Sequence, residues 1–182
     1  MRKRLLDRAL QLVPKHGWSH ACLAAAAVDI GLSSAAAGIC GSPAALVRHH
    51  VEAYNQQLAE EQQEGTLRDR LQRVCRQRVM MTSRVSSTWP EALQTLPAGE
   101  ALSLLHDTAD QCWYLAGDRS TGMNYHVKRA ALGALLAAAE LHLLTDPDED
   151  KADTLKFLEE GVDTMLEKYS QGAAWVQLAA KQ

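Results

Sequence analysis

Hydrophobic positions recur every three or four residues along most of the chain. Such stripes run through residues 5–13, 67–85, 102–116 and 155–169, and this spacing is typical of amphipathic helices. Residues 124–144 are instead apolar almost all round, which predicts a central, buried helix. Proline and glycine separate the stripes and mark the expected helix ends, at Pro14 with Gly17, Gly65, Pro90, Pro97 with Gly99, 117–122 and Pro147.

Two shorter helices are expected close to the N-terminus. Ser19 can cap a helix that ends near residue 30, and Ser33 can cap another over residues 34–39, since serine hydroxyls accept hydrogen bonds from the first helical amides. The residues Gly31-Leu32-Ser33 make a turn between them, and a helix pair joined in this way predicts a helix-turn-helix. Ser42 and Pro43 then begin a longer helix that continues to about residue 64.

The composition agrees with an all-α fold. The chain has 182 residues, of which 47% are hydrophobic and 5% aromatic, and alanine and leucine, both good helix formers, supply most of the apolar content. We expect a helix-turn-helix-like region at 1–64, a helical region of the ligand-binding type at 65–170 and a short tail at 171–182. The four cysteines are scattered singly, so we expect them to be reduced and mostly buried.

The ends of the chain and its apolar runs give no targeting or spanning signal. The basic start Met1-Arg2-Lys3-Arg4 runs directly into an amphipathic pattern, so no signal-peptide core follows it. The chain is then either a mature form or a fragment that has lost an upstream targeting segment. The longest apolar stretch, 130–144, is interrupted by polar residues and is too short to cross a bilayer.

The helix-turn-helix lacks the side chains that bind DNA. A DNA-binding helix needs lysine or arginine for phosphates and arginine, lysine, asparagine or glutamine for base edges. Residues 17–47 contain no lysine or arginine, and residues 34–40 are small and apolar. The formal net charge of the chain is -3, so no general basic field compensates. We therefore expect no nucleic-acid partner.

The arrangement over residues 4–58 resembles the N-terminal domain of TetR-family repressors. The resemblance implies a TetR-like fold, in which the rest of the chain is a helical ligand-binding and dimerising region. Repressors of that family usually carry a lysine and two aromatic residues in the segment that corresponds to 34–40, where this chain has none. A TetR-type transcriptional regulator is therefore the least favoured function.

No catalytic or metal-binding motif accompanies these helices. The seven histidines are dispersed, and the chain contains neither the H-E-x-x-H pattern nor the Glu-x-x-His pattern of di-iron sites. It also lacks a G-x-S-x-G nucleophile motif, a P-loop and a glycine-rich dinucleotide turn. We expect a protein that is not an enzyme and holds no metal or catalytic cofactor.

Several blocks of unlike residues fall together and resemble one family. They are Val13-Pro14-Lys15-His16-Gly17-Trp18, the 31–37 turn, Trp89-Pro90-Glu91-Ala92-Leu93, the 113–121 block that starts Trp113-Tyr114-Leu115, Asn124-Tyr125 and Lys128-Arg129-Ala130. This set looks like the ninth coenzyme Q protein family, mitochondrial accessory proteins of ubiquinone biosynthesis with a TetR-like fold. The similarity runs from about Leu5 to Tyr169.

The resemblance implies a function without bond chemistry. Members of that family bind isoprenoid lipids, including ubiquinone intermediates, in an apolar cavity of the helical region. They dock on the di-iron enzyme demethoxyubiquinone hydroxylase, at the matrix side of the mitochondrial inner membrane. Asp110, Trp113 and Tyr114 stand at positions of the family's partner-binding patch. An alternative is that the same fold serves as a structural subunit of a larger mitochondrial, respiratory assembly.

The individual residues leave alternatives open. Trp113 and Tyr114 point about 100° apart on a helix, so either one is buried while the other shields the surface, or the pair forms an exposed anchor for a partner. The candidate wall of a lipid cavity is Leu102, Leu105, Ala131, Leu135 and Ala138. The small residues of 124–144, among them Gly133, equally suit tight helix packing.

Two charged residues have similar alternatives. Arg129 is expected to pair with Asp118 across the 117–122 turn, because a buried charge needs a partner. Arg78, inside an apolar stripe, is a buried ion-pair residue, a dimer contact or a ligand clamp.

The chain departs from the family at two places. Gly122 stands where the family usually has an acidic residue. The tail at 171–182 carries Trp175, Val176 and Leu178 but only Lys181 as a basic residue, so we expect weak peripheral membrane contact. The seam of apolar residues in 155–169 suits either a homodimer interface or an intramolecular core.

Overall fold

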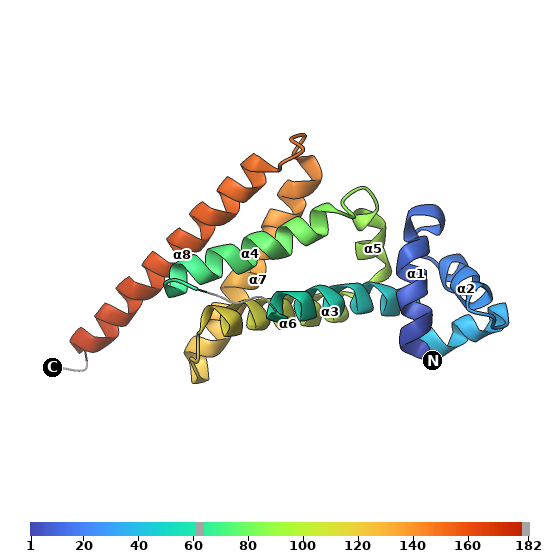
Figure 1. Ribbon diagram of the computed structural model, residues 1–182. Helices are drawn as coiled ribbons and strands as arrows, with labels where there is room; N and C mark the ends of the chain where they lie inside the picture. Colours follow the sequence, from blue (N-terminus) through green and yellow to red (C-terminus); the bar gives the residue numbers. More distant parts are fainter. Residues whose placement is uncertain (61–63, 180–182) are drawn as a thin grey trace. The chain divides into compact units, whose positions relative to one another are not determined.

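The computed structural model describes residues 1–60 and 64–179, with the side chains of 1–58 and 64–171. Within these residues every regular element is a helix and no strand is present, which confirms the all-α class. Figure 1 shows the helices in chain order: α1 (Arg2–His16), α2 (His20–Asp29), the 3-10 helix η1 (Ser34–Cys40), α3 (Ala44–Glu60), α4 (Leu67–Ser83), α5 (Trp89–Thr95), α6 (Ala98–Ala116), α7 (Gly122–Thr145) and α8 (Ala152–Ala179).

The chain forms two compact units, each built from two segments. The N-terminal unit comprises residues 1–57 and 84–104, and the C-terminal unit comprises 58–83 and 105–182. The boundaries differ from the expected regions, because residues 84–104 return to the N-terminal unit. A stripe of hydrophobic residues shows that a helix has a buried face but does not show which other helix covers it.

The helix-turn-helix region follows the predicted caps. The Ser19 hydroxyl accepts a hydrogen bond from the Cys22 amide at 3.2 Å, and the Ser33 hydroxyl accepts one from the Ala35 amide at 3.3 Å. Gly31 makes the turn with a φ of 82°, a conformation that residues with a Cβ rarely adopt. The predicted third helix is a 3-10 helix rather than an α-helix. Among its residues only Cys40 is buried, so little packing energy holds a longer α-helix there.

Three helix boundaries differ from the sequence-based expectation. Pro14 lies inside α1, which ends at His16 and is capped by Gly17 with a φ of 64°. A proline near the end of a helix removes only one hydrogen bond, so α1 continues past it. Gly99 lies in the first turn of α6 instead of a loop, and α5, a short helix with Pro90 in its first turn, was not predicted.

An aromatic cluster forms much of the core of the N-terminal unit. The ring of Trp18 packs edge-on against His50 and Trp89, with ring centroids 5.3 and 6.0 Å apart. The Trp18 indole Nε1 donates a hydrogen bond to the Thr88 hydroxyl at 3.2 Å. These contacts join α3 and the segment before α5 to the α1–α2 connection.

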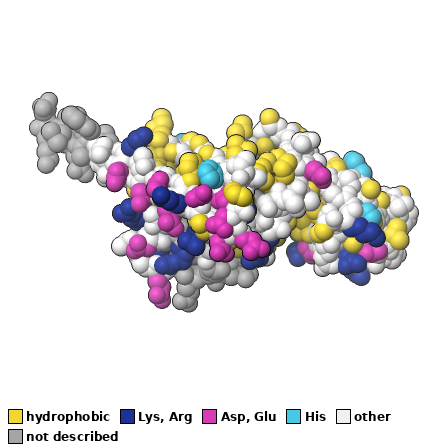
Figure 2. Space-filling model, turned by 90° about the horizontal axis from the view of Figure 1, so that it is seen from above, with side chains coloured by type: hydrophobic (Ala, Val, Ile, Leu, Met, Phe, Trp, Pro, Cys, Tyr) yellow, Lys and Arg dark blue, Asp and Glu magenta, His cyan; other side chains and the backbone are white. Residues whose placement is uncertain are grey.

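The core of the C-terminal unit lies between α4, α7 and α8, which pack on one another. Leu155, Leu158, Val162 and Met165, four residues of the predicted seam, are buried within the chain. Their burial agrees with the intramolecular alternative for this seam. Figure 2 shows that hydrophobic side chains gather along one side of this unit and charged side chains of both signs along the other.

Buried charges in this unit are paired. The Arg78 guanidinium lies 3.3 Å from the Glu140 carboxylate, and Arg78 is only 4% exposed. The buried-pair interpretation of Arg78 therefore holds. Arg129 pairs with Asp118 at 2.7 Å, as the sequence predicts.

The last helix continues through most of the predicted tail. The backbone of α8 is helical to Ala179, whereas the side chains of Trp175, Val176, Leu178 and Lys181 lie outside the described residues. Weak membrane contact through this tail stays a prediction. In the described part of the chain, no helix by itself has the length and apolar composition to cross a bilayer. The α2 and η1 helices reach that length and composition only when taken together, and they are bent sharply at the turn between them.

Candidate functional site

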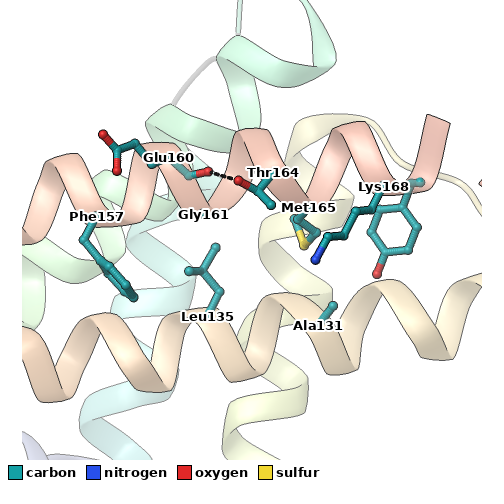
Figure 3. A pocket seen from close by; sticks show the side chains of 9 residues that line it. Ala131, Leu135, Phe157, Glu160, Gly161, Thr164, Met165 and Lys168 are labelled. Carbon is teal, nitrogen blue, oxygen red and sulfur yellow. Dashed lines mark hydrogen bonds between the residues drawn. The ribbon is translucent and has the colours of Figure 1, made fainter. Parts of the chain in front are cut away.

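A groove runs between α7 and α8 in the C-terminal unit. Its volume is about 490 Å³, and it is lined by Ala131, Leu135, Phe157, Glu160, Gly161, Thr164, Met165, Lys168 and Tyr169. Figure 3 shows Leu135 pointing from α7 toward α8, with Phe157 at one end of the groove and Lys168 at the other. Most of the wall is apolar, so the groove can cover a hydrophobic ligand.

Gly161 shapes the middle of this groove. A Cβ at this position would lie 2.4 Å from the Leu135 Cδ1, which is far inside van der Waals contact. The absence of a side chain therefore lets Leu135 reach the backbone of α8. The two helices therefore approach closely at this point.

Two of the five residues predicted to line a cavity lie in the groove. Ala131 and Leu135 do so, whereas Leu102, Leu105 and Ala138 do not. Leu102 is 67% exposed on the part of α6 that belongs to the N-terminal unit. The Leu105 side chain instead packs against Gly133, where a Cβ would meet it at 3.4 Å. The second wall of this groove is α8, whereas Leu105 on α6 packs on another face of α7. A role of Leu102, Leu105 and Ala138 in lipid binding stays a prediction.

Most lining residues come from α8 and were missed in the sequence. Phe157, Gly161, Thr164 and Lys168 follow one another at spacings of four, three and four residues, which places them on one helix face. They form a second stripe beside the buried seam. A glycine in the interior of a long helix, flanked at this spacing by Phe157, is the signal that could have indicated the groove.

A buried ion-pair network joins the end of α6 to the start of α7. The Asp118 carboxylate accepts hydrogen bonds from Lys128 at 2.5 Å, Ser120 at 2.5 Å and Arg129 at 2.7 Å. Burial raises the pKa of Asp118, but these three donors outweigh it and hold the pKa well below its usual range. The network fixes the turn between the two helices.

Trp113 belongs to the core beside this network. The residue is 0% exposed, and its indole Nε1 donates a hydrogen bond to the Lys128 carbonyl at 3.0 Å. The adjacent Tyr114 is 55% exposed. The structure thus agrees with the alternative of one buried and one surface aromatic, and Trp113 does not offer its ring to a partner.

Tyr114 and Asp110 share the surface above the network. The Arg119 guanidinium lies 4.1 Å from the centre of the Tyr114 ring, a cation–π contact that holds the ring in place. Asp110 accepts a hydrogen bond from the Arg129 Nε at 2.9 Å, and its side chain is 41% exposed. Two of the three predicted partner-binding residues are therefore accessible.

Comparison with known proteins identifies a COQ9 domain in the chain. The family model COQ9 matches residues 98–167. The human "Ubiquinone biosynthesis protein COQ9, mitochondrial" is 34% identical over 91% of this chain and 58% of its own length. The Xenopus tropicalis protein of the same name is 33% identical over 99% of this chain and 61% of its own length. Residues 98–167 therefore form a COQ9 domain.

The COQ9 relationship extends to distant organisms but covers only part of each relative. The "Probable ubiquinone biosynthesis protein coq9, mitochondrial" of Dictyostelium discoideum is 27% identical over 90% of this chain. The chain spans about three fifths of the length of the curated COQ9 proteins it matches. These relatives are named biosynthesis proteins, and their names state no enzymatic reaction.

The segment matched by the COQ9 family model contains both structural features described above. It includes the Asp118 network and every groove residue except Lys168 and Tyr169. Within the described residues, no cluster of three or more histidine, cysteine or acidic side chains is arranged to hold a metal ion. The described part of the chain presents a hydrophobic groove and an exposed tyrosine, Tyr114.

Proposed function

We propose that this chain serves ubiquinone biosynthesis as a non-enzymatic lipid-binding protein. It holds an isoprenoid quinone intermediate in the α7–α8 groove and acts on the matrix side of the mitochondrial inner membrane. The observation that carries the proposal is an open, mostly apolar groove in a chain whose relatives are named mitochondrial ubiquinone biosynthesis proteins.

The dimensions and chemistry of the groove suit an isoprenoid chain. Ligand pockets for small molecules commonly measure about 300–1,000 Å³ and are mostly apolar, and this groove of about 490 Å³ falls in that range. Ala131, Leu135, Phe157 and Met165 supply hydrocarbon surface along it. An isoprenoid tail laid along the groove would remove that surface and its own from water.

We further propose that the lipid is presented to a partner, the di-iron demethoxyubiquinone hydroxylase. The docking surface is centred on Tyr114, because exposed tyrosines are frequent anchors of protein interfaces. Met123 and Val127, at the start of α7, are exposed by 77% and 45% and extend the apolar surface of this unit. Asp110 adds a negative charge beside it.

Filling the groove tests the lipid proposal. The Ala131→Trp variant places a large ring in the groove, so we expect its affinity for an isoprenoid quinone to fall at least about tenfold, the effect of losing roughly 1.4 kcal/mol of binding. Native mass spectrometry of the purified protein, with lipid extraction, measures the bound fraction.

The matched control is Ala134→Trp, the same substitution at an exposed position of the same helix. It should bind lipid as the wild type does. Recovery of no lipid from monodisperse wild-type protein, even after incubation with the quinone, would refute the proposal.

The docking proposal is tested with Tyr114→Ala. Truncation of an exposed ring leaves the core intact, and we expect the affinity for the hydroxylase, measured by pull-down, to fall about thirtyfold, as for a hot-spot residue worth roughly 2 kcal/mol. Trp113 is unsuitable for this test because its substitution would disturb the core. The control is Leu141→Ala, which truncates another hydrophobic residue of this unit that is 62% exposed.

Two results would contradict this docking surface. One is undiminished recovery of the hydroxylase by a folded Tyr114→Ala variant. The other is recovery of the wild-type chain with a respiratory complex and without the hydroxylase, which would favour the alternative of a structural subunit.

A further inference from the structure

The two ends of the α7–α8 groove differ in chemistry. Phe157 and Leu135 form a hydrocarbon end, whereas Lys168 lies at the opposite end. Figure 3 shows the Lys168 side chain extending from α8 toward α7, beside Met165, so that its ammonium group enters the groove. The groove is therefore directional.

Lys168 is the donor that the groove leaves available. The Tyr169 hydroxyl donates to the Val127 carbonyl at 3.0 Å, and the Thr164 hydroxyl donates to the Glu160 carbonyl at 2.9 Å. The Lys168 ammonium makes no hydrogen bond or ion pair with any residue whose side chain is described. An ammonium group carries three donors, which can meet a ligand oxygen in the groove.

The acidic residue of the groove wall does not oppose Lys168. Glu160 precedes Lys168 by eight residues on the same helix, a distance of about 12 Å at 1.5 Å per residue. Figure 3 shows its side chain directed away from α7, so Lys168 attracts an anionic group at its own end of the groove. The position of Lys168 thus favours one orientation of an acidic ligand.

We propose that Lys168 is a specificity-determining residue that binds an anionic oxygen of the lipid head group. The groove then prefers amphiphiles with an ionised carboxylate or phenolate, held with the head at Lys168 and the hydrocarbon chain toward Phe157. This inference rests on the proposed lipid function and adds the chemical class and direction of the ligand to it.

The exposure of Lys168 limits how strongly the groove prefers an anionic ligand. Lys168 is exposed, so water and salt weaken its attraction for an anion, but a charge-assisted hydrogen bond remains stronger than one to a neutral group. We expect a preference of about fivefold at low salt for an anionic over a neutral amphiphile of equal chain length, and a smaller preference at high salt.

The test compares dodecanoate with dodecanol by isothermal titration calorimetry below their aggregation concentrations. Near pH 8 a carboxylate is ionised and a lysine is protonated, since their ordinary pKa values are about 4 and about 10. The proteins are the full chain and its variants Lys168→Met, Lys168→Arg and Lys156→Met. Lys156 is an exposed lysine of α8 outside the groove, so its variant controls for the loss of one charge.

We expect the wild type, Lys168→Arg and Lys156→Met to prefer dodecanoate, and Lys168→Met to lose the preference while binding dodecanol unchanged. Equal binding of both amphiphiles by the wild type, or a preference that survives in Lys168→Met, would overturn the inference and leave lipid binding intact. Failure of the wild type to bind either amphiphile would overturn the proposed lipid function together with it.

Discussion

The ion pairs of the C-terminal unit show how burial changes the importance of similar residues. Arg129 and Asp118 are 3% and 6% exposed. They pair with each other, and Ser120, Lys128 and Asp110 supply their further partners. Arg68 and Asp163, by contrast, pair at the surface between α4 and α8. Removing one partner of a buried pair leaves an uncompensated charge, whereas water replaces a lost partner at the surface.

We expect Asp118→Asn to lower the free energy of unfolding by about 3 kcal/mol at pH 7. The native pKa of Asp118 is depressed, so its stabilisation is complete above the unfolded-state pKa of about 3.9 and is lost as the pH falls through the lower native pKa. The difference between wild type and variant should therefore shrink as the pH falls below about 4. Urea unfolding at several pH values measures both effects.

Asp163→Asn is the matched control for this prediction. It removes the same charge from a surface pair and should cost at most about 1 kcal/mol. Equal losses in the two variants would show that burial of the Asp118 network is unimportant for stability.

At the scale of elements, the helix-turn-helix retains its turn but not a regular third helix. Gly31 needs its positive φ of 82°, whereas Gly38 in η1 has an ordinary conformation with open space around the position of a Cβ. The first glycine is required by the backbone, and the second adds only conformational freedom to the unfolded chain. Their sequence contexts alone do not distinguish them.

Alanine substitution should separate the two glycines. Gly38→Ala should raise the free energy of unfolding by about 0.5–1 kcal/mol, because it restricts the unfolded chain. Gly31→Ala should lower it by about 1–2 kcal/mol, the cost of a left-handed conformation for a residue with a Cβ. Thermal and urea unfolding measure both, and destabilisation by Gly38→Ala would contradict the conformation described for η1.

At the scale of the whole molecule, the charge of the chain disfavours DNA binding, the usual function of a helix-turn-helix. The net charge is -3, and residues 17–47 offer no lysine or arginine to phosphates. In η1, Ile39 is 50% exposed where a DNA-binding helix would present a polar side chain. Nucleic-acid binding depends on neutralising phosphates, and this region lacks the groups that do so.

We expect no measurable binding of a random DNA duplex at low salt. Fluorescence anisotropy with a labelled duplex, titrated to concentrations of about 100 μM, which lies in the range of ordinary non-specific binding, measures it. Dissociation constants in the micromolar range that weaken as salt is added would contradict the prediction. A TetR-type repressor with its own operator serves as the positive control.

The sequence by itself determined the helical class, most helix positions, the caps at Ser19 and Ser33, and the pairing of Arg129 with Asp118. These features depend on residues close in the chain, where spacing along a helix or across a short turn decides the contact. The same local information showed that the helix-turn-helix lacks lysine and arginine, and it identified the blocks that resemble the COQ9 family.

Only the tertiary structure decided which helix faces meet. Of the adjacent residues Trp113 and Tyr114, the first is buried and the second is exposed, because only one face of α6 is covered by other helices. The groove likewise depends on the approach of α8 to α7 at Gly161, thirty residues beyond the first predicted wall residue of α7, Ala131. Helical periodicity shows that a face is apolar, but the partner that covers it is set by packing between distant segments.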